Sequence, residues 1–344
     1  MPVLCRSAPG AASELNLDGL ENSVRAEPPF DLQPCVQDHI PANTVLESGL
    51  WADGDAPRAV ERELVAVDDH SGEPLEAHCP DPAVQTRIVR LNGEGGPGNR
   101  SAVRNAGWSD CDTDIIVFLD GDMVPSPNFV NAIRELHQEQ PSIVVKAQRL
   151  SLSRDEQALG KDYCLRWIAS QQQCAAPSDE ASRSKRLTHI GRESCKRTND
   201  WYLAASNALS VERKFVEQIG GWDEEYFGWG EEDMDFAYRL HLAGMSFVFP
   251  PPSLLFAVHL DHPVAATQRD SLRQNARRFV TKYPEVFSVR MPAYSACGIL
   301  ASNVKDPFES LFDDTPLQST TERYPDGVYY GSSLSQAGGH GSQD

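Results

Sequence analysis

Residues 113–123 read TDIIVFLDGDM, an apolar run that ends in two aspartates separated by one glycine. Ile115 to Leu119 are apolar without alternation, which is typical of a strand buried on both faces in a parallel sheet covered by helices. Ligands of open α/β sheets collect at the carboxyl ends of strands, and Asp120 and Asp122 could hold a divalent cation against a phosphorylated ligand there. The alternative is a simple Asp-Gly turn after the strand.

The segments on either side of this strand alternate between strand and helix patterns. Strands are expected at 63–67, 86–91 and 142–146, and helices at 99–108, 128–139 and 271–282. This alternation predicts an α/β fold with a mostly parallel central sheet flanked by helices.

The composition narrows the classes of partner. Among 344 residues, 31 basic residues stand against 50 acidic ones, a net charge of −19, which argues against a nucleic-acid partner or an anionic membrane. The eight cysteines are scattered without CxxC pairs, so neither a zinc site nor a disulfide framework is indicated. The sequence shows neither a leader pattern nor a long apolar stretch, and a soluble cytoplasmic protein without an integral membrane span is expected.

A second predicted strand also ends in acids, in the stretch VAVDDHS at 65–71. Asp68 and Asp69 could accept hydrogen bonds from a pyrimidine imide or from ribose hydroxyls, and a helix cap by Asp69 or Ser71 explains them equally well. The glycine-rich stretch 93–98 then leads into a helix that carries Arg104. Such a loop either favours a phosphate or is an ordinary surface loop.

Two later segments carry further candidate groups. Residues 220–235 read GGWDEEYFGWGEEDMD, with a helix expected to begin near Glu231 or Glu232. Acids in the first turn of a helix interact favourably with the helix dipole, which is one explanation for them. Here, however, they stand beside two tryptophans, and an indole ring can pack against a sugar ring. One of the acids could then act as a general base on an acceptor hydroxyl. Residues 256–263 read FAVHLDHP. One of His259 and His262 could complete a metal site with Asp122, or be structural.

Taken in this order, the segments resemble family 2 nucleotide-sugar glycosyltransferases of the GT-A fold. VDDHS is similar to the family's VDDGS, VRNAGW at 103–108 to its aRN-G segment, and FLDGDM at 118–123 to its DXD motif. The block at 220–240 and HLDHP at 259–263 resemble the C-terminal segment of β-1,4-galactosyltransferases and polypeptide N-acetylgalactosaminyltransferases. The resemblance spans 63–282 and implies a single Rossmann-like GT-A domain.

The resemblance implies a metal-dependent transfer, with inversion, of a hexosyl or N-acetylhexosaminyl group from a UDP-sugar to a carbohydrate or small-molecule hydroxyl. The cofactor would be Mn²⁺ or Mg²⁺. A retaining transferase and a degenerate sugar-nucleotide or glycan-binding protein remain alternatives. The implied roles are donor nucleotide binding by Asp68, Asp69, Arg104 and Asp120; metal binding by Asp122 and His259; acceptor binding by Trp229 and Asn207; and catalysis by Asp233 as the base, with Glu232 orienting the hydroxyl.

Two departures from the family pattern affect these expectations. The family opens with a strand ending P-x-Y-N, whereas the best candidate here, residues 30–37, has no Tyr-Asn. Glu231 stands where the family has glycine, and it is expected to narrow the acceptor approach. The expected organisation is a disordered segment at 1–28, a nucleotide-sugar half at 29–150, a variable insertion with a helix and a mobile loop at 151–199, an acceptor and catalytic half at 200–290, and a largely disordered extension at 291–344.

Overall fold

The computed structural model describes residues 43–47, 63–71, 75, 85–91, 98–111, 113–126, 129–173, 200–262, 268–301 and 304–314. The predictions for residues 1–28 and 30–37, most of the glycine-rich stretch, the proposed loop of the insertion after residue 173, and the tail from 315 lie outside the described residues.

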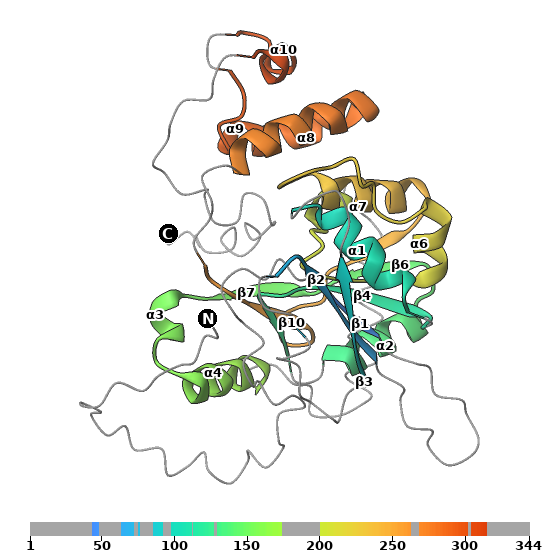
Figure 1. Cartoon of the computed structure of the whole chain (residues 1–344), viewed down its shortest axis with the longest axis vertical. Helices are drawn as coiled ribbons and strands as arrows, with labels where there is room; N and C mark the ends of the chain where they lie inside the picture. The colour runs from blue at the N-terminus through green and yellow to red at the C-terminus, as the bar shows by residue number, and fades with distance from the viewer. Residues whose placement is uncertain are drawn as a thin grey trace, which may run out of the picture.

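A seven-stranded sheet forms the centre of the molecule (Figure 1). Its spatial order is β3 (Gln85–Leu91), β2 (Glu63–Asp69), β1 (Asn43–Glu47), β4 (Ile115–Asp120), β8 (Ala208–Glu212), β6 (Ile143–Lys146) and β9 (Ser246–Val248). Only the outer pairs, β2 with β3 and β6 with β9, are parallel among these described strands, because β1 and β8 run opposite to their neighbours. The α/β class is confirmed, but the prediction of a mostly parallel sheet is wrong.

The central strand β4 is buried on both faces, as its apolar run predicts. Ile116 and Phe118 belong to one core cluster, which includes residues of α1 (Arg100–Ser109), α6 (Arg213–Ile219) and α7 (Glu232–Leu242). Ile115, Val117 and Leu119 belong to a second cluster with α2 (Phe129–Glu139). Helices therefore cover both faces of β4, and this cover, rather than the direction of the neighbouring strands, explains why the run does not alternate.

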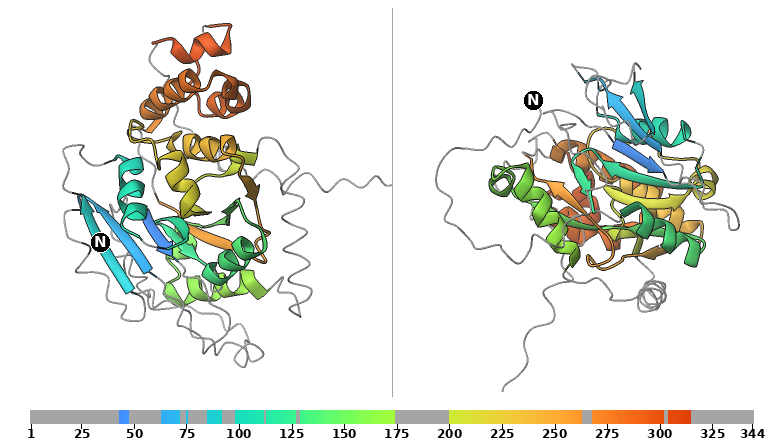
Figure 2. Two further views of the ribbon diagram at one scale, coloured as in Figure 1. Left: turned by 90° about the vertical axis from the view of Figure 1, so that its right-hand side faces the viewer. Right: turned by 90° about the horizontal axis from the view of Figure 1, so that it is seen from below.

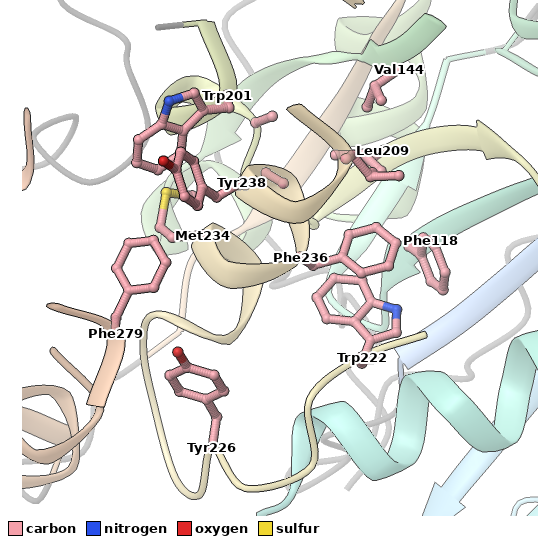
Figure 3. Packing of buried hydrophobic residues seen from close by; sticks show 14 of the residues in the cluster. Phe118, Val144, Trp201, Leu209, Trp222, Tyr226, Met234, Phe236, Tyr238 and Phe279 are labelled. Atoms are coloured by element: carbon pink, nitrogen blue, oxygen red, sulfur yellow. The ribbon is translucent and has the colours of Figure 1, made fainter. Parts of the chain in front are cut away.

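Aromatic packing fixes α7 against the sheet. Trp222 and Phe236 stack with ring centroids 3.9 Å apart, and the ring of Phe118 meets both edge-on at 5.1 and 5.5 Å (Figure 3). Such aromatic pairs add stability beyond the area that they bury. The start of α7 is thereby held close to the carboxyl end of β4.

A three-stranded sheet brings a late segment of the chain to the same end of β4. Its order is β5 (Met123–Pro125), β10 (Phe256–Leu260) and β7 (Gln148–Leu152), with β10 antiparallel to β5. His259 is registered opposite Met123, and the Leu260 N–H donates to the Asp122 carbonyl at 2.9 Å. This pairing places the histidine segment beside the aspartates that follow β4.

The remaining helices lie outside the two sheets. α3 (Arg154–Gln157) and α4 (Lys161–Gln173) follow β7, and the 3-10 helix η2 (Asp200–Leu203) precedes β8. α8 (Gln268–Lys282), η3 (Pro284–Val286), α9 (Phe287–Ala296) and α10 (Pro307–Phe312) gather at one end, next to α7 (Figures 1 and 2). Among the described residues, no helix has the length and apolar character needed to span a membrane.

Candidate active site

Asp122 and two histidines form a compact cluster at the end of β4. Asp122 Oδ2 lies 3.2 Å from His259 Nε2 and 2.9 Å from His262 Nε2, and one ligand atom from each of the three residues lies within 4.8 Å of the others. Asp261 Oδ1 is 3.0 Å from His259 Nδ1, so that ring nitrogen is engaged on the side away from Asp122. The structure therefore brings both candidate histidines to Asp122.

The chemistry of this cluster fits a divalent transition-metal ion. Asp122 Oδ1 is buried and has no hydrogen-bond partner among the described residues, although buried carboxylate oxygens are normally paired. Burial alone would raise the pKa of Asp122, but hydrogen bonds from His259 and His262 hold it well below its usual range. One ionised carboxylate with two imidazoles suits manganese better than magnesium.

Arg104 on α1 connects the two ends of the site. Its guanidinium lies 3.4 Å from Asp120 Oδ1 and 3.2 Å from Glu232 Oε1, and it stacks 4.5 Å above the Trp222 ring. Arg104 is only 2% exposed, and the neighbouring carboxylates raise its pKa although burial alone would lower it. One permanent cation thus joins the acid that ends β4 to the first turn of α7. Donor nucleotide binding by Arg104 stays a prediction.

Asp68 and Asp69 at the end of β2 are buried and have protein partners. Asp68 accepts from the Ser71 N–H at 2.8 Å and lies 3.3 Å from Arg90 Nη1. Asp69 accepts from the Gly98 N–H at 3.0 Å and lies 2.9 Å from His70 Nδ1. Asp69 therefore connects the end of β2 to the residues just before α1. Nucleotide binding by Asp68 and Asp69 stays a prediction.

The helix α1 is capped by Asn99, whose side chain accepts from the Ala102 N–H at 3.0 Å. The alternative in which Asp69 or Ser71 caps a helix concerns the stretch after residue 71, of which only residue 75 is described before β3, so it stays an alternative.

The first turn of α7 carries the candidate base. Glu232 Oε1 faces Arg104, whereas the buried Oε2 has no hydrogen-bond partner among the described residues. Asp233 Oδ1 accepts from the Met234 N–H at 3.0 Å. Burial and the nearby Glu232 raise the pKa of Asp233 to about 7, although Arg104 opposes this shift. A carboxylate with such a pKa can accept a proton near neutral pH.

A lysine that the sequence analysis missed lies in the same region. Lys146 ends β6, and its Nζ donates to Asn207 Oδ1 at 2.5 Å and to the Ala147 carbonyl at 3.0 Å. The Asn207 carbonyl in turn accepts from the Asp120 N–H at 3.4 Å. Burial lowers the pKa of Lys146 to about 7, while Asp120 and Asp233 oppose this shift. The available signal was a charged residue directly after the apolar run 143–145, as at the acid-tipped strands.

The lysine also orients the predicted acceptor residue Asn207. An ammonium can only donate, so the Asn207 carboxamide must turn its oxygen toward Lys146. Its NH₂ group is then left as a donor.

Trp229 lies in the loop before α7, partly buried against the first core cluster. Its backbone N–H donates to Ser271 Oγ at 3.0 Å, and the nearby Phe227 is 53% exposed. The backbone of this loop is therefore held by α8, and the loop exposes the aromatic side chain of Phe227. Stacking of Trp229 on a sugar stays a prediction.

Glu231 does not lie where the sequence led us to expect it. Its side chain is fully buried and turns toward α9, where Arg290 Nη2 lies 2.6 Å from Oε1 and the Tyr294 hydroxyl lies 3.2 Å from Oε2. The expectation that Glu231 narrows the acceptor approach is therefore wrong, because its carboxylate is taken up by a buried ion pair.

Comparison with known sequences gives a family match over most of the sheet and the whole candidate site. The family described as "Glycosyltransferase like family 2" matches residues 60–265. "Probable N-acetylgalactosaminyltransferase 9" of Caenorhabditis elegans is 24% identical over 227 residues, which cover 63% of this chain and 37% of that protein. "Uncharacterized glycosyltransferase YfnE" of Bacillus subtilis (strain 168) is 25% identical over 261 residues, with 67% and 64% covered.

Two further likenesses are more partial. "Chondroitin synthase" of Pasteurella multocida (strain Pm70) is 28% identical over 201 residues, which cover 54% of this chain and 20% of that protein. A crystal structure of GalNAc-T7 with UDP, GalNAc and Mn²⁺ gives a TM-score of 0.45 at 13% identity, with 72% and 47% covered, a likeness too low to carry an argument. This chain thus spans less than two thirds of the length of each of these relatives.

Proposed function

This chain belongs to the glycosyltransferase-like family 2, and we propose that it transfers a hexosyl or N-acetylhexosaminyl group from a UDP-sugar to an acceptor hydroxyl with inversion. The resemblance drawn from the motifs is confirmed at the level of the family. One observation carries the proposed reaction: Arg104 lies between Asp120 at the end of β4 and Glu232 at the start of α7. The predicted donor and acceptor groups are therefore adjacent.

On the donor side, Asp122, His259 and His262 would hold a divalent cation, with Mn²⁺ preferred over Mg²⁺ because of the two imidazoles. When bound, such a cation offsets negative charge on the diphosphate leaving group. Asp120 faces Arg104 and, in this proposal, accepts hydrogen bonds from the ribose. Asp68 and Asp69, at the end of β2, complete the nucleotide side.

On the acceptor side, Asp233 takes the proton of the attacking hydroxyl. Its pKa of about 7 leaves a substantial fraction of the carboxylate ionised and still basic near neutral pH. The unpartnered Glu232 Oε2 accepts from the acceptor and orients it. Asn207 and Trp229 contribute a hydrogen-bond donor and an aromatic face. Attack by a hydroxyl activated on the side opposite the leaving group gives inversion.

The test is release of UDP from a panel of UDP-sugars in the presence of Mn²⁺. We expect Asp122→Ala and Asp233→Asn each to lower turnover by roughly 10²- to 10⁴-fold. Asp155→Asn, which neutralises an exposed acid of α3 outside the site, serves as the control and should leave turnover unchanged. Turnover that survives both site substitutions would contradict the assignment.

Two outcomes of the same assay identify the alternatives. Binding of UDP without turnover on any donor would indicate a sugar-nucleotide-binding protein. A product with the anomeric configuration of the donor would indicate a retaining enzyme, and would remove Asp233 from the role of base.

A further inference from the structure

Glu231 occupies a strained position at the junction between the loop and α7. Its φ is +67°, in the left-handed region that favours glycine, and its carbonyl accepts the first bond of the helix from the Asp235 N–H at 2.8 Å. A glycine would adopt this backbone without strain. The side chain must therefore supply something that offsets the strained conformation.

What the side chain supplies is a buried ion pair with α9. Glu231, Arg290 and Tyr294 are 0%, 2% and 0% exposed, and the two glutamate oxygens are shared between the guanidinium and the phenol. Burying two charges costs solvation energy even when they are paired, so stability alone is a weak reason for such a pair. The pair does fix one geometry, because both partners lie far from solvent.

α8 and α9 lie beyond the matched residues 60–265, yet both hold the segment that leads into the base. Asn275 Nδ2 on α8 donates to the carbonyls of Phe227 at 3.0 Å, Trp229 at 3.4 Å and Gly230 at 2.8 Å. Arg290 on α9 pairs with the side chain of the next residue, Glu231. Residues 227–231 are thus held almost continuously from the C-terminal helices.

We propose that Arg290 and Glu231 are positioning residues for the transfer reaction: from a helix outside the matched region, their buried pair sets the position of the first turn of α7 and the electrostatic environment of Asp233. This inference rests on the proposed function, in which Asp233 is the base. It adds a role for a part of the chain to which the family match assigns none.

The charges around Asp233 make the proposal measurable. The charged groups that act electrostatically on this carboxylate are Glu231 at the N-terminal boundary of α7, Glu232 on α7, Arg104 on α1, Arg290 on α9 and Lys146 on β6. Glu231 raises the pKa of Asp233, whereas Arg290 lowers it. Removing one member of the pair leaves the other uncompensated, so the two single substitutions have opposite signs.

The experiment is the pH dependence of kcat/KM, measured as UDP release on the full chain with Mn²⁺ and an acceptor. Its acidic limb reports the pKa of the base. We expect Arg290→Met to move this limb to higher pH, and Glu231→Gln to move it to lower pH, each by roughly half a unit or more. The double variant Glu231→Gln with Arg290→Met should return the limb toward its original position, because opposite charges are removed together.

A matched control separates positioning from simple support of the C-terminal helices. Arg277 ties α8 to the last turn of α10, through the Leu311 carbonyl, and to the residues that follow it, through the Asp313 carbonyl and the Asp314 carboxylate. Arg277→Met removes the same charge from the same end of the molecule, so it should lower thermal stability and leave the pH profile in place. Arg290→Lys should restore part of the original profile.

Two results keep the inference distinct from the proposed function. If the original chain releases no UDP from any UDP-sugar, the proposed function fails. If the original chain is active but the acidic limb stays in place in both folded single variants, or moves in the same direction in both, the function stands and the inference is overturned. Circular dichroism establishes that each variant is folded before its profile is read.

Discussion

The two halves of the candidate site are both rich in acids but differ in what balances the charge. At the metal half, the Asp122 side chain is 30% exposed and faces His259 and His262, whose side chains are 15% and 52% exposed. At the base half, Glu231 and Glu232 are almost fully buried and face Arg290 and Arg104, which remain charged at any working pH. The metal half therefore pairs its carboxylate with two side chains that can also bind a metal ion, whereas the two buried glutamates of the base half each lie beside a permanent cation.

The largest expected effect comes from removing one of the permanent cations of the base half. Arg104→Met would leave Asp120 and Glu232 without their shared cation, and we expect the free energy of unfolding to fall by about 3–5 kcal/mol. Arg87→Met is the control, because Arg87 pairs with Asp110 where both side chains are about two-fifths exposed, and such pairs contribute roughly 1 kcal/mol or less. Urea unfolding measures both. Equal losses would mean that the buried bridge is no more important than a surface pair.

A smaller effect should distinguish the two histidines of the metal half. His259→Ala should weaken Mn²⁺ binding by roughly 10- to 100-fold, because this ring is mostly buried and Asp261 holds its Nδ1. His262→Ala should weaken it less, because that ring is half exposed. Titration calorimetry with Mn²⁺ gives both affinities. The assignment of His259 as the principal ligand would be wrong if the order were reversed.

The smallest effect is on the pH dependence of stability at the base half. The folded protein raises the pKa of Asp233 from 3.8 to about 7, so the stability contributed by its protonated form is present below pH 3.8 and is lost as the pH rises through about 7. Asp233→Asn should therefore be more stable than the original chain at pH 8, by on the order of 1 kcal/mol since the carboxyl is partly exposed. At pH 4 the difference should nearly vanish.

Urea midpoints at the two pH values, without added metal, test this sign. Asp155→Asn is again the control, because its exposed carboxyl should give the same small change at both pH values. A stabilisation by Asp233→Asn at low pH only would show that the carboxyl is favoured in its charged form.

Features that depend on a local pattern could be predicted from the sequence. The strand predicted at 115–119 is β4, and the helix predicted to begin near Glu231 or Glu232 is α7. The approach of a late histidine to Asp122 was also expected, and the pairing of β10 with β5 produces it. Each rests on an apolar run, a helical period or a motif order, and these are properties of contiguous residues. Family membership followed from the same motifs.

Features that depend on distant partners could not be predicted. The apolar run of β4 indicates burial on both faces but carries no information on strand direction, so the mixed sheet was missed. The side chain of Glu231 is directed by Arg290, 59 residues further along, and Lys146 acquires its role only from Asn207, 61 residues away. Nothing in the neighbouring sequence marks these partners, because each contact is created by packing.

The way that α8 holds the loop before α7 bears on how the acceptor preference of this chain could change. Asn275 grips residues 227, 229 and 230 by their carbonyl oxygens, groups that every amino acid has. The path of the loop is therefore largely independent of the side chains at positions 227 and 229. Substitutions there can alter the surface offered to an acceptor while the backbone leading to the base keeps its course, which separates the evolution of specificity from the preservation of catalysis.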